Sequence, residues 1–130
     1  MKSDFESQQK LFLSWAAASG FISVAMGAFA AHAIKGQLSS ELMEVFQTGI
    51  RYQMFHTVAL AIVAFINERS FHSWTTAAGW FFIVGIFLFS GSLYALALSG
   101  VRIWGAVTPW GGLCFLIGWM ILFLGNQKNP

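Results

Sequence analysis

Four long apolar stretches, separated by short polar segments, dominate the hydrophobic pattern of the chain. The clearest stretch runs from residue 73 to residue 101 and contains no Asp, Glu, Lys, Arg or His. A bilayer core of about 30 Å is crossed by roughly 20 apolar residues in helical form. A buried helix of a water-soluble protein keeps a polar outer face, and this stretch has none. The pattern therefore predicts a membrane-spanning helix at residues 74–98.

The same reasoning predicts three further spans, at residues 11–33, 49–66 and 103–124. The second is the most polar, and an amphipathic segment at residues 41–50 leads into it. In the fourth, Pro109 predicts a kink or a weakened first third, because proline removes a helix hydrogen bond. We therefore predict one all-α domain over residues 1–130, an integral membrane bundle of four transmembrane helices with an amphipathic lead-in on the second.

The first apolar stretch has an alternative interpretation as a cleavable signal peptide, in which Ala28-Phe29-Ala30 resembles a small-residue cleavage site. Its length exceeds the usual apolar core of about 7–15 residues in such peptides, which favours a retained span. Four spans place both termini on one side of the membrane. That side carries Lys2, Lys10, Arg69 and Lys128, against Lys35, Arg51 and Arg102 on the other. This excess of basic residues predicts that both termini lie in the cytoplasm.

Composition agrees with membrane insertion and narrows the classes of function. Hydrophobic residues make up 57% of the chain and charged residues only 9%, against about 25% charged residues in soluble domains. The net charge of +2 is small and the basic residues do not cluster, so a nucleic-acid partner is not expected. No phosphate-binding loop, dinucleotide fingerprint, zinc-protease motif or serine-nucleophile motif is present, so we predict no enzyme, no catalytic residue and no cofactor.

Small residues recur at helical spacing in the predicted spans. Ser19, Ser23 and Gly27 are spaced four residues apart, and Gly91 and Gly118 mark similar positions further along the chain. Small residues let two membrane helices approach closely. We therefore predict that these five residues pack helices together. For Ser19 and Ser23, a hydrogen bond to the carbonyl four residues back is the alternative.

Polar side chains inside the predicted spans form the candidate functional cluster, because polar groups are costly in hydrocarbon and face partners or cavities. The candidates are His32, Arg51, Gln53, His56, Ser90, Ser92 and Tyr94. They suit either a path for a small solute or proton, or hydrogen bonds that hold helices together, and we favour the second.

Two geometric expectations follow from the sequence positions. The two histidines, His32 and His56, could lie at similar depth on antiparallel spans, which would suit haem or a metal. The lack of a third ligand weakens that hypothesis, and we predict no metal site. Glu44 and Arg51 are about 10 Å apart along the helix axis, so we expect no direct pair between them.

Four segments resemble those of one family in order and spacing. They are Gly27–Ala33, Thr48–His56, Phe89–Tyr94 and Thr108–Gly112. Together they resemble the YgdD/YwdK-like small inner-membrane proteins (domain of unknown function 423), which are similar to transmembrane protein 256. The resemblance covers residues 11–124 and implies a four-helix protein of the bacterial inner membrane without an assigned reaction. The family has Gly where this chain has Ala30, so a looser helix contact is expected there.

The main hypothesis is a non-enzymatic inner-membrane protein that packs against a partner or helps it assemble. The expected partners are the lipid bilayer and either a second copy of the chain or another membrane protein. The alternative is a component of a small-solute or ion transporter or channel, and a haem- or metal-binding membrane protein is a weaker third hypothesis.

Overall fold

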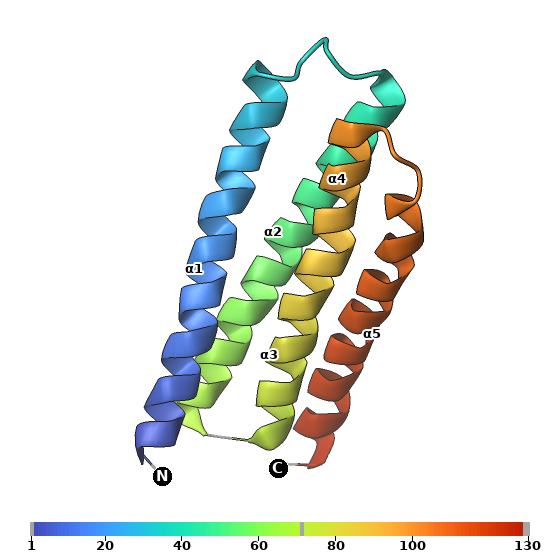
Figure 1. Cartoon of the computed structure of the whole chain (residues 1–130). Helices are drawn as coiled ribbons and strands as arrows, with labels where there is room; N and C mark the ends of the chain where they lie inside the picture. Colours follow the sequence, from blue (N-terminus) through green and yellow to red (C-terminus); the bar gives the residue numbers. More distant parts are fainter. Residues whose placement is uncertain (1, 71, 129–130) are drawn as a thin grey trace.

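The computed structural model describes residues 2–70 and 72–128, and in this part of the chain all regular structure is helical. The elements are α1 (Lys2–His32), α2 (Ser40–Arg69), α3 (Ser73–Gly85), the π-helix η1 (Ile86–Gly91), α4 (Ser92–Ser99) and α5 (Trp104–Lys128). The segments α3, η1 and α4 continue one another, so the described chain forms four long antiparallel rods (Figure 1). Each rod contains a stretch long and apolar enough to cross a membrane. The predicted all-α fold with four membrane-spanning helices is confirmed.

The amphipathic lead-in and the second span form a single helix, α2. Ser39 caps its N-terminus by accepting a hydrogen bond from the backbone N–H of Leu42 at 3.2 Å. In the lead-in, Phe46 and Ile50 are buried whereas Glu44 is exposed, as the period of the sequence predicts. A 30-residue helix is about 45 Å long, so α2 extends beyond a hydrocarbon core of about 30 Å.

The third span differs from the uniform α-helix predicted for it. Ile86–Gly91 form a π-helix in the middle of the span. At this point Gly111 of α5 passes so close to Phe89 that a Cβ on Gly111 would clash with the Phe89 backbone nitrogen and lie 2.7 Å from its Cα. Such π-segments are rare and often occur near functional sites. The sequence gives no signal for this one, because the contact that accompanies it joins residues of two different spans.

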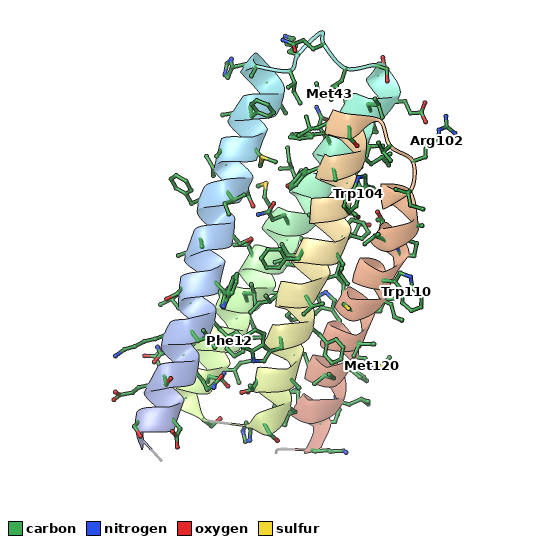
Figure 2. The ribbon with its side chains drawn as sticks, viewed as in Figure 1. Phe12, Met43, Arg102, Trp104, Trp110 and Met120 are labelled. Atoms are coloured by element: carbon green, nitrogen blue, oxygen red, sulfur yellow. The ribbon has the colours of Figure 1, made fainter. Side chains whose placement is uncertain are left out.

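The fourth span remains helical through Pro109, because α5 is continuous from Trp104 to Lys128. Its outer face points away from the bundle: Trp110 and Met120 project outward, whereas Phe12 of α1 lies within the bundle (Figure 2). Large apolar side chains are exposed on every rod, including Phe21 and Leu116. A contiguous apolar surface of this kind suits hydrocarbon and not water.

The four rods do not contact one another equally. The helix α1 packs chiefly on α2 and touches α3 only weakly, whereas α5 packs on α3, η1 and α4. Two buried apolar clusters result, one around Phe12, Leu60 and Phe82 and the other around Phe46 and Ile50. A buried polar layer lies between them along the helices, and it contains most of the candidate site.

Candidate functional site

A closed set of hydrogen bonds joins α1, α2 and α4 in the middle of the bundle. Its centre is Gln53 of α2, whose side chain is 3% exposed. The Gln53 amide nitrogen donates to the Ser19 backbone oxygen at 3.2 Å and to the Ser19 hydroxyl at 3.3 Å. The Tyr94 hydroxyl donates to Gln53 Oε1 at 2.6 Å. We call Ser19, Gln53, Thr57 and Tyr94 the amide ring.

Thr57 completes the amide ring and fixes the direction of its hydrogen bonds. The Thr57 hydroxyl donates to the Gln53 backbone oxygen at 2.8 Å. Because that bond uses its only proton, the 2.6 Å bond between Ser19 Oγ and Thr57 Oγ1 must be donated by Ser19. Every hydroxyl proton of the ring is therefore used within the protein, and the Gln53 amide nitrogen donates to both oxygens of Ser19. The ring gives these buried polar groups the hydrogen-bond partners that hydrocarbon cannot supply.

His56 lies one turn further along α2, in an aromatic environment. Its Nδ1 lies 2.7 Å from the Tyr52 backbone oxygen, and its Nε2 lies 3.1 Å from Trp119 Nε1 of α5. A carbonyl can only accept and an indole N–H can only donate, so Nδ1 carries the proton and Nε2 accepts. The ring also stacks on Phe115 with centroids 3.5 Å apart. Both ring nitrogens of this neutral histidine therefore have partners, and the bond to Trp119 holds α2 to α5.

The other candidates lie apart from the amide ring. Ser90 donates to the Gly49 backbone oxygen at 2.7 Å and fastens η1 to α2. Ser92 lies 2.6 Å from the Thr108 hydroxyl and links α4 to α5. His32 is exposed at the end of α1. It does not share the depth of His56, which lies 16 residues, or about 24 Å, from the corresponding end of α2.

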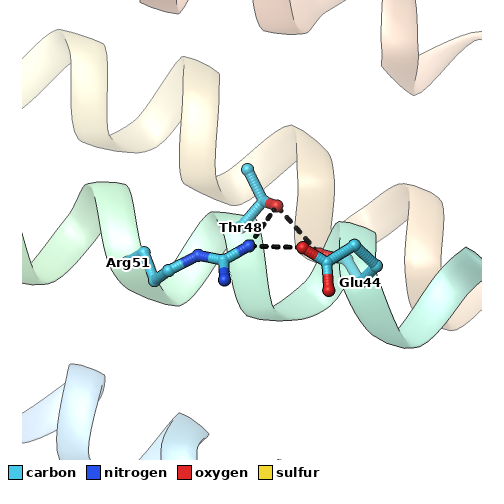
Figure 3. Close-up of polar contacts among 3 residues, drawn as sticks. All are labelled: Glu44, Thr48 and Arg51. Atoms are coloured by element: carbon cyan, nitrogen blue, oxygen red, sulfur yellow. Dashed lines mark hydrogen bonds and ion pairs between the residues drawn. The ribbon is translucent and has the colours of Figure 1, made fainter.

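Arg51 corrects an expectation, because it does pair with Glu44. The Arg51 guanidinium lies 2.5 Å from Glu44 Oε1 and 3.0 Å from the Thr48 hydroxyl (Figure 3). Seven residues make almost two full turns, so both side chains project from the same face of α2. Cβ atoms tilt toward the helix N-terminus, which directs Arg51 back toward Glu44, and the two long side chains cover the remaining distance. The pair is exposed, so it lies outside the buried polar layer.

The predicted packing residues fall into two groups. Ser19 and Ser23 are buried on the side of α1 that faces α2, and an added Cβ on Gly118 would lie 2.6 Å from the Phe82 ring. An added Cβ on Gly27 or Gly91 would meet no atom within 4 Å, so no helix of the described chain approaches them closely. Ala30, which stands where the family has glycine, still makes a close helix contact. It is buried in the cluster around Phe46.

Sequence reasoning missed Thr57, Thr108 and Trp119 as partners of the candidate residues. Thr57 could have been found from its position four residues after Gln53, on the same helix face. Thr108 and Trp119 carry no local signal, because their partners lie in other spans. A further buried pair, in which the Thr75 hydroxyl donates to Asn67 Oδ1, joins the start of α3 to the end of α2.

The arrangement brings no metal-ligand set together. Among the described residues, no three His, Cys, Asp or Glu side chains gather in one place. Likewise, no described cavity is lined by Arg51, His56, Ser92 and Tyr94 together. Five of the buried or half-buried candidate groups bond to another helix, which is the arrangement expected of groups that hold a membrane bundle together: Gln53, His56, Ser90, Ser92 and Tyr94.

Comparison with known proteins agrees with this membrane architecture. The model of the family described as "Protein of unknown function (DUF423)" matches residues 26–112. No solved structure matches the chain.

Curated relatives match over most of their length. The chain is 45% identical over 116 residues to the "UPF0382 inner membrane protein YgdD" of Escherichia coli (strain K12), covering 89% of this chain and 88% of the relative. It is 38% identical over 120 residues to the "UPF0382 membrane protein YwdK" of Bacillus subtilis (strain 168), covering 92% and 98%. It is 43% identical over 119 residues to the "UPF0382 membrane protein SH2409" of Staphylococcus haemolyticus, covering 92% and 97%. A family match over more than half of the chain, together with these relatives, identifies the protein as a member of the DUF423 family of membrane proteins, whose molecular function is unknown.

Proposed function

We propose that this protein is a non-enzymatic membrane protein that acts by packing laterally against a transmembrane helix, supplied by a second copy or by another membrane protein. The observation that carries the proposal is the open surface at Gly27. An added Cβ there would meet nothing within 4 Å, and Ala31 beside it is exposed. Small residues at such positions admit another helix at close range.

A shallow groove surrounds Gly27 and gives this surface a polar border. It has a volume of about 290 Å³ and is lined by Gly27, Ala30, Ala31, Gln47, Ile50 and Arg51. We call it the α1–α2 groove. Gln47 is exposed, so its amide is available to a polar group on an incoming helix. Interhelical hydrogen bonds of this kind stabilise membrane contacts by about 0.6 kcal/mol on average.

Cross-linking in native membranes tests the proposal. With Cys114→Ser removing the native thiol, Ala31→Cys should form a cross-linked adduct with its partner, and Gly27→Leu should abolish that adduct by filling the groove. Leu116→Cys, exposed on α5, is the control position. Adducts that form equally at both positions, or that survive Gly27→Leu, would refute lateral packing at this surface. The mass of the adduct separates a second copy from another protein.

A non-enzymatic role is supported by the positions of the reactive groups. The glutamates at 6, 41, 44 and 68 are all exposed and lie toward the ends of their helices. The buried serine hydroxyls donate to backbone or side-chain oxygens, so none is paired with a base. Nothing in the geometry favours a transport path, so we do not propose one.

The location and orientation belong to the same proposal. The name of the Escherichia coli relative supports the bacterial inner membrane. The basic residues support cytoplasmic termini, because those at the terminal end of the bundle outnumber the two in the opposite loops once Arg51 is placed within α2. In a Cys114→Ser background, a membrane-impermeant maleimide should label Gly36→Cys in cells with a permeabilised outer membrane and Gln127→Cys only after lysis. The reverse pattern would overturn the orientation.

A further inference from the structure

A second groove opens on the other side of α1, toward the third span. It has a volume of about 220 Å³. One wall comes from α1 through Trp15, Ala18 and Ile22, and the other from η1 through Ile86, Phe87 and Gly91. We call it the lateral groove. It exists because α1 packs on α2 and only weakly on α3.

Aromatic contacts lie at both ends of the lateral groove. At one end, Phe12 packs against Gly79 and makes an edge contact with Trp80, with ring centroids 6.1 Å apart. At the other, the Tyr94 ring, which lines the groove, lies 5.0 Å from the ring of Phe46 on α2. Ile22 and Phe87, one on each wall, are exposed, so the groove opens sideways toward the surrounding lipid.

The depth of the groove places it inside the hydrocarbon. Gln53 at its floor lies 13 residues, or about 20 Å, from the start of α2, a helix about 45 Å long. This is near the middle of α2. At the mouth, Trp15 and Phe87 meet edge to face with centroids 5.8 Å apart, one from each wall.

The polar atoms at the floor decide which ligands fit. Gln53, Ser19 and Tyr94 line the groove, but the amide ring uses both hydroxyl protons, and the Gln53 amide nitrogen already donates to Ser19. The Ser90 hydroxyl donates its proton to the Gly49 backbone oxygen. The floor thus offers no free hydroxyl donor to a ligand carbonyl, phosphate or quinone oxygen. Apolar cavities of roughly 150 Å³ remain dry and accept apolar guests, so hydrocarbon matches this groove and polar ligands do not.

We propose that the lateral groove is a binding site for one acyl chain of a membrane phospholipid, held between α1 and η1 with Trp15 and Phe87 at its mouth. The chain enters sideways from the bilayer, where acyl chains are the hydrocarbon available at this depth. Filling the groove replaces a void against which the lining atoms would lose dispersion contacts. This site is distinct from the α1–α2 groove and does not depend on the proposed lateral packing.

Photolabelling of the full chain tests the site. The protein is placed in nanodiscs of phosphatidylethanolamine and phosphatidylglycerol, with a small fraction of phosphatidylcholine that carries a diazirine in the middle of one acyl chain. Mass spectrometry should find severalfold more adducts on Trp15, Ile22 and Phe87 than on Leu116, which faces general lipid on α5. Equal labelling of the groove and of Leu116 would overturn the proposal.

Matched glycine variants sharpen the result. An added Cβ meets nothing within 4 Å at either Gly91 or Gly27. Gly91→Leu should fill the lateral groove and lower its labelling severalfold, whereas Gly27→Leu, in the other groove, should leave it unchanged. Groove labelling that persists in a folded Gly91→Leu protein refutes the site. Should that variant fail to fold by circular dichroism, Ala18→Leu on the opposite wall provides the same test. A polypeptide cross-linked at Ala18→Cys in place of lipid adducts would identify a helix as the occupant and also overturn the proposal.

Discussion

The close passage of α5 against η1 makes Gly111→Ala the most informative stability experiment. An added methyl group would clash with the Phe89 backbone nitrogen and lie 2.7 Å from its Cα. Backbone atoms cannot rotate away as a side chain can, so α5 and η1 must separate. Gly112→Ala is the matched control, because its methyl group would lie 3.8 Å from the Phe89 ring, an ordinary contact.

The magnitude follows from comparing the two neighbours. Both substitutions gain about the same helix propensity, up to about 1 kcal/mol, so that gain cancels in the difference. Overpacking typically costs about 1–3 kcal/mol, and more where the backbone cannot relax. We therefore expect Gly111→Ala to be about 1–3 kcal/mol less stable than Gly112→Ala.

Reversible unfolding in mixed micelles with increasing SDS, followed by circular dichroism and tryptophan fluorescence, measures this difference. Gly111→Ala should unfold at a lower SDS fraction than the wild type, whereas Gly112→Ala should unfold at the same fraction or a higher one. Coincident unfolding curves for the two variants would refute the close contact between α5 and the π-helix. The same outcome would also leave the π-helix of the third span without an explanation from packing.

Three further substitutions test the polar contacts, each by the same unfolding measurement. Tyr94→Phe removes the donor to Gln53 and should cost about 1–3 kcal/mol, because the amide oxygen is left without that partner in a buried site. Trp119→Phe leaves Nε2 of His56 without its donor and should cost about 1–3 kcal/mol from the unsatisfied acceptor. Arg51→Gln breaks an exposed ion pair and should change stability by at most about 1 kcal/mol, with an effect that shrinks as salt is added.

Exposed positions of the same residue types provide the controls. Tyr52→Phe and Trp110→Phe alter side chains that are 45% and 66% exposed and should change stability little. A loss from Tyr52→Phe as large as that from Tyr94→Phe would show that the amide ring is not what stabilises the bundle. If Trp119→Phe is neutral, the histidine does not depend on the indole donor. A large, salt-independent loss from Arg51→Gln would place that pair in a dry environment.

Much of the fold could be predicted from the sequence because hydrophobic length and helical period are local properties. The absence of charge between residues 73 and 101 was sufficient to predict the third span. The lead-in of α2 was predicted from the alternation of Phe46 and Ile50 with Glu44. The ion pair of Arg51 with Glu44 was missed although both lie on one helix, because axial separation was considered without the reach and tilt of the side chains.

The candidate site could be predicted only as a set of residue types. Gln53 and Tyr94 were both singled out as polar groups within spans, but their bond joins positions 41 residues apart. The same separation applies to Ser90 and Gly49. Which polar side chain meets which depends on how far each helix slides and rotates against the next, and periodicity along one helix does not specify that.

The sequence by itself determined the surroundings of this protein: four apolar stretches of sufficient length require hydrocarbon, and hydrocarbon requires that backbone hydrogen bonds be made within each helix. The tertiary structure alone decided where the helices leave space and where they do not. It closed the amide ring around Gln53, brought α5 against the π-helix at Gly111, and left the two grooves beside α1 open. The physical reason is that helix formation depends on neighbours along the chain, whereas packing and polar pairing depend on the fit between surfaces that are distant in the sequence.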